Sequence, residues 1–162
     1  MRGLRHEIRQ ESPFRSPEEE AYLNLQRTAN ILLQGLTRLL RDRAPGTAGM
    51  TPSQYNVLRI LRGSHPDALT CGEIGERLVT PGPDVTRLLD RLEQQAWVER
   101  ERDVVDRRVV RSRITEQGLG VLADLDGAVD RWLHEQLGHL GGEDLGALSE
   151  LMVRARTPSD GH

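Results

Sequence analysis

The sequence has no lysine, one cysteine and few aromatic residues, and it has no long apolar run. The single Cys71 excludes an intramolecular disulfide framework and a zinc site built from several cysteines. No apolar run approaches the roughly 18–20 residues that a membrane span needs. Residues 1–15 contain arginines but lack the apolar stretch of a secretory signal. We therefore expect a cytoplasmic protein with no membrane segment.

The composition itself is that of a folded protein, and its charge is unevenly distributed. The 162 residues are 36% hydrophobic and 29% charged, which suits a globular core better than a disordered chain. All 22 basic residues are arginines, and 25 acidic residues give a net charge of −3. Residues 1–70 carry ten arginines against seven acidic residues, residues 71–115 carry nine of each, and residues 116–162 carry three against nine. An anionic partner should therefore meet the first 115 residues rather than the tail.

Three helix starts stand out, because Ser16, Thr51 and Thr70 are each followed three residues later by Glu or Gln, as in a capping box. Apolar residues at helical spacing then predict helices over about 17–42, 52–62, 71–78, 83–95, 116–138 and 143–155. Breaks are expected at 45–49 and at Gly141-Gly142. Residues 97–102 and 109–114 instead favour two strands joined by the polar loop 103–108.

A hairpin directly after a short helix–turn–helix predicts a winged helix, a mainly α fold with a small β-wing. We expect a flexible N-terminal arm over 1–16 and a dimerisation helix over 17–48. A winged helix-turn-helix DNA-binding lobe over 49–115 should follow, then dimerisation helices over 116–156 and a disordered tail over 157–162. The flanking helices are too long for the small core of the lobe, so we expect a homodimer built from both ends of the chain.

In a helix–turn–helix the second helix enters the major groove of double-stranded DNA and presents its N-terminal residues to base edges. The candidate contacts of this recognition helix are Pro83, Asp84, Thr86, Arg87 and Arg91. Arg87 can bind guanine with both arms of its guanidinium, and Thr86 can contact a thymine methyl or a phosphate.

Further DNA contacts are predicted outside that helix, at the wing residues Asp106, Arg107 and Arg108 and at Thr70, a candidate phosphate contact. Arg107 or Arg108 can enter a narrow minor groove, where the potential is most negative. The alternative is that the arginines of both elements only solvate the surface. In that case they would pair with the acidic residues Asp84, Asp90, Asp103 and Asp106.

Residues 85–100 (VTRLLDRLEQQAWVER) and 103–115 (DVVDRRVVRSRIT) resemble the recognition helix and wing signature of the MarR family, the multiple antibiotic resistance regulators. The resemblance covers about 17–155. It implies a dimeric winged-helix repressor, more rarely an activator, that binds a pseudo-palindromic operator. It also implies that Arg108 reaches the minor groove, that Asp106 orients the wing by pairing with a neighbouring arginine, and that Thr86 and Arg87 contact DNA.

The sequence departs from the family pattern at two places. Ala96 replaces the glycine that usually follows the recognition helix, where a positive φ is expected. The turn Pro81-Gly82-Pro83 is unusually rigid.

The resemblance also implies a small-molecule effector, since many relatives bind a phenolic or aromatic acid between the dimerisation helices and the DNA-binding lobe. Tyr55, Leu58 and Arg59 are the candidate pocket residues, with Arg59 as the carboxylate partner. The alternative is that Tyr55 and Leu58 are core residues and Arg59 is a surface residue. Cys71 is interpreted as a bystander, because the peroxide-sensing cysteine of some relatives lies in their first helix.

Other functions have less support. The acidic final third is compatible with a winged-helix module that binds proteins and not DNA. An enzyme is not expected, because there is no glycine-rich phosphate loop, no HExxH motif and no nucleophile elbow. The histidines form no plausible metal set, so neither a metal nor a cofactor is predicted.

Overall fold

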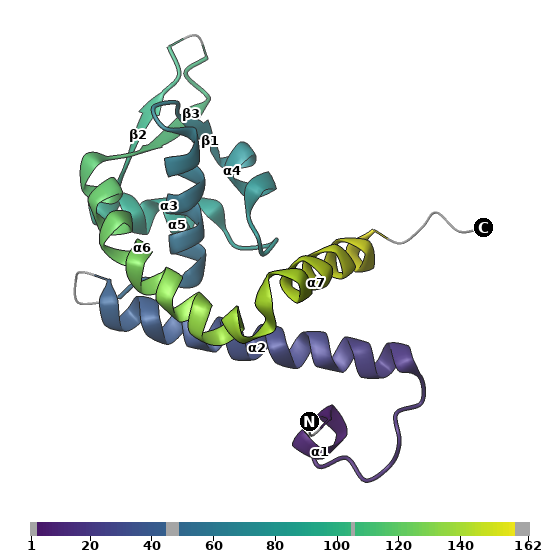
Figure 1. The fold of residues 1–162 in the computed structure, drawn as a ribbon. Helices are drawn as coiled ribbons and strands as arrows, with labels where there is room; N and C mark the ends of the chain where they lie inside the picture. The colour runs from purple at the N-terminus through teal and green to yellow at the C-terminus, as the bar shows by residue number, and fades with distance from the viewer. Residues whose placement is uncertain (1–2, 45–48, 105, 158–162) are drawn as a thin grey trace.

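The computed structural model describes residues 3–44, 49–104 and 106–157. The helices are α1 (Leu4–Glu7), α2 (Pro17–Arg43), α3 (Pro52–Ser64), α4 (Cys71–Arg77), α5 (Val85–Gln94), α6 (Glu116–Leu137), the 3-10 helix η1 (Gly138–Leu140) and α7 (Gly141–Arg156). The strands are β1 (Leu69–Thr70), β2 (Val98–Arg102) and β3 (Val110–Ile114). The predicted class, mainly helical with a small β-wing, is confirmed (Figure 1).

The predicted N-caps are confirmed, with one difference. Thr51 and Thr70 form complete capping boxes with the residues three positions later. The Ser16 hydroxyl accepts a hydrogen bond from the backbone N–H of Glu19 at 3.3 Å. The Glu19 carboxylate accepts from the backbone N–H of Arg15 at 2.6 Å and pairs with the Arg15 side chain, so the start of α2 has a cap without a reciprocal bond.

The sheet is antiparallel in the order β1-β3-β2, with β3 at its centre. Strand β1 was not predicted, because two residues are too few to show the alternation of apolar and polar side chains that marks a strand. In it Leu69 lies opposite Ser112, and Thr70 lies opposite Arg111. Since α4 begins immediately after β1, the start of the helix–turn–helix is joined directly to the inner strand of the wing.

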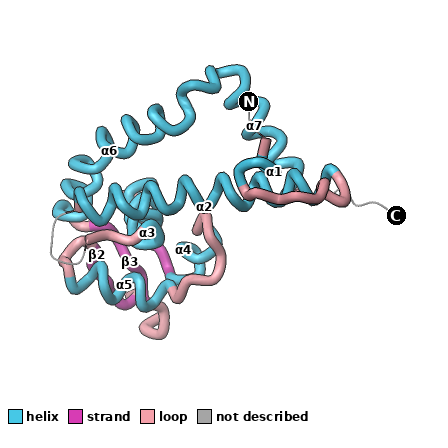
Figure 2. Tube along the Cα trace, turned by 90° about the horizontal axis from the view of Figure 1, so that it is seen from below, coloured by secondary structure: helices cyan, strands magenta, loops and turns pink. Residues whose placement is uncertain are grey.

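Helix α3 lies at the centre of the lobe and packs against α2, α4, α5, α6 and β3 (Figures 1 and 2). The largest fully buried apolar side chains are Leu40, Leu58, Leu61, Ile74, Leu89, Leu92, Leu122, Leu125, Val57 and Val98. Three of them, Val57, Leu58 and Leu61, come from α3, which packs against both the helix–turn–helix and the long flanking helices. This arrangement fixes the recognition helix relative to α2 and α6.

Two helix starts differ from the prediction. Helix α5 begins at Val85, because Asp84 is its N-cap and accepts a hydrogen bond from the backbone N–H of Arg87 at 3.2 Å. Pro83 therefore lies outside the recognition helix. At the other end of the chain, Gly141 has a φ of 75°, which glycine adopts without strain, and α7 begins there instead of at residue 143. The predicted break is a bend between η1 and α7.

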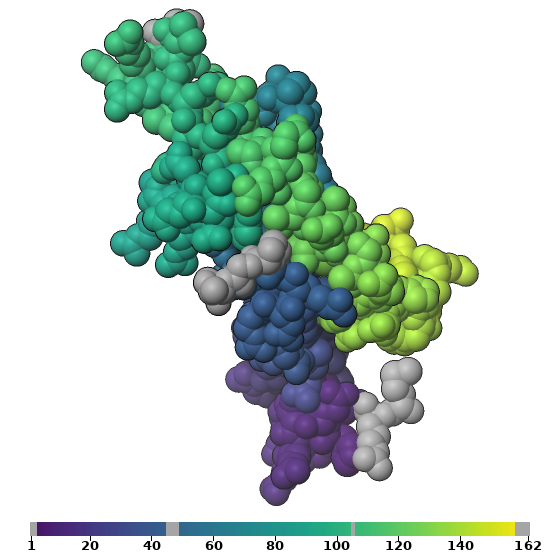
Figure 3. Space-filling view, turned by 90° about the vertical axis from the view of Figure 1, so that its left-hand side faces the viewer, coloured from purple at the N-terminus to yellow at the C-terminus, as the bar shows by residue number. Residues whose placement is uncertain are grey.

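The segment 1–16, predicted as a flexible arm, contains α1, which packs against α2. Leu4 is 4% exposed, and the Glu7 carboxylate pairs with Nε of Arg27 at 2.9 Å. These tertiary contacts explain why α1 is helical although it is only four residues long. Figure 3 shows α1 and the wing at opposite ends of the molecule. Residues 45–48 of the break expected at 45–49, and residues 158–162 of the tail expected at 157–162, lie outside the described residues.

Across the described residues, no helix has the length and hydropathy to cross a membrane.

Candidate nucleic-acid interface

Helix α5 separates its apolar and polar residues as predicted. Leu88, Leu89 and Leu92 are buried, whereas Thr86, Arg87 and Arg91 are exposed. The opposite face of the helix is thus free of core contacts. It presents two cations and a hydroxyl at helical spacing, which is the chemistry that reads base edges in a major groove.

Asp84 organises the start of this helix. Its carboxylate caps α5 and also lies 3.2 Å from Nε of Arg87, whose side chain is 81% exposed. An exposed pair of this kind contributes little to stability, so Arg87 can exchange it for a phosphate or a base. Within the described part of the chain, Arg91 has no acidic partner within 4 Å.

The wing loop is shaped by backbone hydrogen bonds. The N–H of Asp103 donates to the carbonyl of Val109 at 2.9 Å, and the N–H of Val109 donates to the carbonyl of Asp106 at 2.9 Å. The Asp106 carboxylate accepts from the backbone N–H of Arg108 at 3.0 Å. The expectation that Asp106 pairs with an arginine side chain is corrected here, because its carboxylate accepts from a backbone N–H. In the loop 103–108 it is Asp103 that pairs with an arginine side chain, that of Arg111, at 2.7 Å.

The outer arginines of the wing differ from the inner ones. Arg107 and Arg108 are exposed and, within the ranges that the structure describes, have no acidic residue within 4 Å. Figure 1 shows their loop projecting beyond the rest of the lobe. Their charge is therefore available to a partner outside the chain.

The inner arginines are neutralised by neighbouring carboxylates. Arg100 pairs with Asp90 at 2.7 Å and with Glu93, and its hydrogen bond to Glu93 is the main cause that raises the pKa of Arg100 above its ordinary value. Arg113 pairs with Glu99 at 2.8 Å and with Glu101. The alternative of paired surface arginines thus describes these two residues. It also describes Arg87, which pairs with Asp84, and Arg111, which pairs with Asp103. It does not describe Arg91, Arg107 or Arg108.

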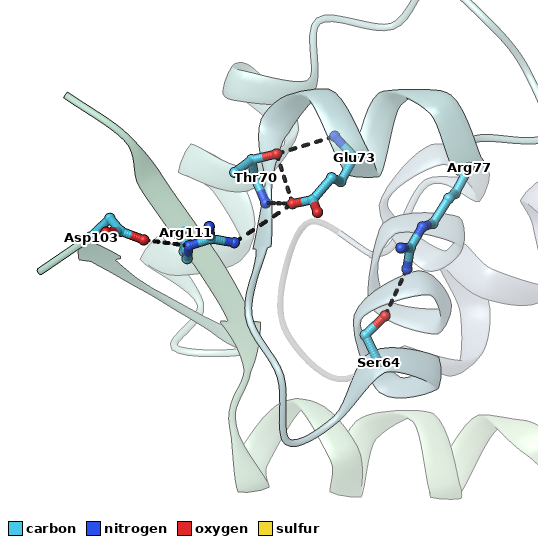
Figure 4. Close-up of polar contacts among 6 residues, drawn as sticks. All are labelled: Ser64, Thr70, Glu73, Arg77, Asp103 and Arg111. Carbon is cyan, nitrogen blue, oxygen red and sulfur yellow. Dashed lines mark hydrogen bonds and ion pairs between the residues drawn. The ribbon is translucent and has the colours of Figure 1, made fainter. Parts of the chain in front are cut away.

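Thr70, the predicted phosphate contact, has its hydroxyl engaged within the chain (Figure 4). The hydroxyl accepts from the backbone N–H of Glu73 at 3.2 Å and donates to the Glu73 carboxylate at 2.8 Å. The backbone N–H of Thr70 donates to the same carboxylate oxygen at 2.8 Å, and this bond is the largest of the influences that lower the pKa of Glu73. Cys71, the next residue, is half-buried.

A cavity of about 420 Å³ lies between α2, α3 and the turn that joins α4 to α5. Tyr55 and Arg59 line it as predicted, and the Arg59 guanidinium lies 5.8 Å from the centre of the Tyr55 ring. Burial raises the pKa of the Tyr55 phenol, and the nearby Arg59 acts in the opposite direction. Leu58 is wholly buried and belongs to the core, so its assignment to the pocket is corrected. Pro83 lines this cavity.

Asn56 is a residue that the sequence reasoning missed. Its side-chain oxygen accepts from the backbone N–H of Val79 at 2.9 Å and so holds the α4–α5 turn against α3. Pro52, Tyr55, Asn56 and Arg59 all line the cavity and follow the spacing i, i+3, i+4, i+7. That helical stripe was a signal that could have identified Asn56.

A short helix–turn–helix followed by a β-hairpin, with exposed arginines on both, defines a winged helix-turn-helix protein. A model of the MarR family matches residues 48–109. The chain belongs to the MarR family.

Individual relatives agree with this assignment. The HTH-type transcriptional regulator MhqR of Bacillus subtilis is 30% identical over 110 residues, which is 65% of this chain and 72% of that protein. The crystal structure of a MarR transcription factor from Planctomyces limnophilus is 37% identical, with a TM-score of 0.66, and the match covers 86% of this chain and 98% of that one. Sco3205 of Streptomyces coelicolor, a MarR family regulator solved in complex with DNA, is 22% identical with a TM-score of 0.73 over 91% of this chain and 96% of its own, a likeness of fold.

Proposed function

We propose that this protein is a transcriptional repressor that binds a pseudo-palindromic operator as a homodimer, a role carried out at the chromosome in the cytoplasm. The observation that carries the proposal is the division of its arginines into two groups. Arg100, Arg111 and Arg113 are paired with carboxylates, whereas Arg91, Arg107 and Arg108 are exposed without an acidic partner among the described residues. Unpaired arginines gain most from DNA phosphates, because they release condensed counterions without first breaking an ion pair.

Each DNA element has its own part in this proposal. Helix α5 lies in the major groove, where Arg87 and Arg91 read base edges and Thr86 contacts a methyl group or a phosphate. The wing follows the backbone into the neighbouring minor groove with Arg108. Asp84 and Asp106 act by capping α5 and by shaping the loop. The main role of the Thr70 hydroxyl is structural, because it forms the capping box of α4, and a phosphate contact is an additional role.

The homodimer is supported by apolar side chains that the single chain leaves exposed. They lie on α2, α6 and α7 and are Tyr22, Leu25, Ile31, Leu33, Leu133, Leu148, Leu151 and Val153. A large exposed apolar surface usually marks an interface. We assign 17–48 and 116–156 to the dimer and 49–115 to DNA binding, so that two lobes related by a twofold axis meet two half-sites.

The effector is proposed to be a small aromatic acid bound in the cavity beside α3. A volume of about 420 Å³ fits a single-ring ligand, the lining offers Leu36 and Tyr55 to the ring, and Arg59 offers a bidentate partner to the carboxylate. The cavity is also lined by Val79 and Pro83 from the turn that precedes α5. A ligand that displaced this turn would move the recognition helix and release the operator.

Selection from a random duplex library tests the DNA-binding function. Enrichment of an inverted repeat at low salt, with affinity that falls steeply as salt increases, supports the proposal. If no inverted repeat is enriched, the regulator function is wrong, and an interaction module without a DNA role becomes the better account. Repeating the binding assay with benzoate, with benzyl alcohol as the uncharged control, tests whether an aromatic carboxylate weakens the complex.

A further inference from the structure

We propose that Arg111 is a positioning residue that holds the wing in a fixed orientation to the start of α4. The proposal rests on the DNA-binding function above. Arg111 lies on the central strand β3, opposite Thr70 of β1 on one side and Glu101 of β2 on the other. Its side chain therefore lies where the wing and the helix–turn–helix meet.

The Arg111 guanidinium contacts both elements (Figure 4). Its Nε donates to the Asp103 carboxylate at 2.7 Å, and its Nη1 lies 3.8 Å from Oε2 of Glu73. Asp103 is the residue at which the wing loop leaves β2, and its carboxylate also accepts from the backbone N–H of Asp106 at 3.2 Å. One side chain thus connects the base of the wing loop with helix α4.

Glu73 is a rigid point of attachment. Its carboxylate accepts hydrogen bonds from both the backbone N–H and the hydroxyl of Thr70, each at 2.8 Å, so its position is set by the capping box of α4. The contact with Arg111 at 3.8 Å is an ion pair without a hydrogen bond. Partly exposed pairs of this kind contribute little to stability, so we expect the link to affect the wing's orientation more than the folding of the chain.

The orientation of the wing matters because Arg108 lies in the loop beyond this junction. A wing that moves freely must be ordered when DNA binds, and this ordering lowers the affinity. Arg111 is flanked by two carboxylates, so its charge is already compensated, unlike that of Arg108. Arg111 therefore acts through the wing and not by contacting DNA.

The chain offers two matched variants. Arg113 lies on the same face of the same strand, but among the described residues its acidic partners are only Glu99 and Glu101 of β2. Arg113→Met removes the same charge and leaves the connection to α4 intact. Glu73→Gln removes the charge that faces Arg111 and keeps the capping box, because Gln serves equally well at the third helical position.

Amide hydrogen exchange in the free protein measures the wing directly. We expect Arg111→Met and Glu73→Gln to speed exchange of the Asp103 and Val109 amides by about two- to fivefold, the range for loss of a partly exposed pair. Arg113→Met should leave these amides unchanged. If Glu73→Gln has no effect, or if Arg113→Met has an equal effect, the positioning role is wrong. Thermal unfolding of each variant checks that the fold is retained.

Operator affinity gives a second readout, one that a purely structural role would not produce. In the otherwise unchanged protein, Arg111→Met should weaken operator binding about two- to fivefold. In the Arg108→Ala background the same change should weaken binding less, because both changes act on the same wing contact. The effects of Arg111→Met and Arg91→Ala on the free energy of operator binding should be additive. Additivity with Arg108→Ala would overturn the inference. If the unmodified chain binds no DNA, the function proposed above is wrong, while the exchange experiment still decides whether Arg111 positions the wing.

Discussion

The hydroxyl of Thr115 donates a hydrogen bond to the backbone carbonyl of Ala96 at 2.7 Å, and its backbone N–H donates to the carbonyl of Trp97 at 3.1 Å. These bonds join the end of β3 to the entry of β2 and so close the base of the wing. Ala96 has a φ of 58°, in the left-handed region expected from the glycine that the MarR family usually has at this position. The residue after the recognition helix is thus held in a conformation that disfavours a Cβ.

The variant Ala96→Gly should raise the free energy of unfolding. Glycine removes the strain of the left-handed conformation from the folded state, but it also raises the conformational entropy of the unfolded chain. The first effect is the larger, so the free energy of unfolding should rise by about 0.5–1 kcal/mol. Urea unfolding followed by circular dichroism measures the change. Ala123→Gly, at an exposed position inside α6, is the control and should lower stability by about 1 kcal/mol. A decrease in both variants would show that Ala96 is not strained.

A second prediction concerns the close approach of α6 to the wing. A Cβ at Gly118 would lie 2.3 Å from the backbone oxygen of Trp97, whereas a Cβ at Gly120 would meet nothing within 4 Å. Gly118→Ala should therefore cost about 1–3 kcal/mol through steric overlap. Gly120→Ala, in the same helix, should stabilise the protein by about 1 kcal/mol, because alanine has the better helix propensity. Equal effects on unfolding by urea would contradict this packing.

Local signals allowed the helix starts and the wing to be predicted from sequence. The caps at Thr51 and Thr70 are chemical signals contained within four residues, and the change from helical to strand spacing near residue 97 marks the wing. The positive φ of Ala96 was expected from the resemblance to the MarR family, whose pattern has a glycine after the recognition helix.

The features that were missed depend on the tertiary arrangement. Strand β1 exists only because β3 pairs with it, and α1 is ordered by the burial of Leu4 against α2. The pairing of Arg111 with Asp103 and Glu73 requires the register of the sheet. The cavity needs three separate elements, which explains why Leu58 was wrongly placed in it and Asn56 was overlooked.

A third prediction separates the two elements that we propose bind DNA, helix α5 and the wing. Arg108→Ala should weaken binding to all sequences and reduce the salt dependence by about one ion, because a minor-groove arginine acts mainly through charge. Arg91→Ala should instead relax the preference for one base pair, at a cost of about 1–3 kcal/mol for the selected operator. Fluorescence anisotropy over a salt series, with selected and scrambled duplexes, measures both effects. Arg131→Ala on the acidic helix α6 is the charge control, and an equal loss there would refute a specific role for either arginine.

A fourth prediction addresses the proposed homodimer. Leu151 on α7 is 56% exposed in the single chain, so Leu151→Asp should leave the fold of the protomer intact and favour the monomer. Light scattering during size-exclusion chromatography measures the mass. Val104→Asp is the control, since Val104 is 96% exposed but lies on the wing, away from the proposed interface. A dimer that tolerates Leu151→Asp would place the interface elsewhere.

The last prediction concerns the effector. Arg59→Met should weaken the binding of benzoate by about 10- to 150-fold, since the lost carboxylate partner is worth about 1.5–3 kcal/mol, while benzyl alcohol should bind wild type and variant alike. Isothermal titration calorimetry measures the affinities. Arg59 is exposed, and its guanidinium lies 5.8 Å from the centre of the Tyr55 ring, so the variant should fold normally and bind operator DNA as tightly as the wild type. If benzoate releases the operator from Arg59→Met as well as from the wild type, the ligand binds at another site, and the cavity beside α3 has no sensing role.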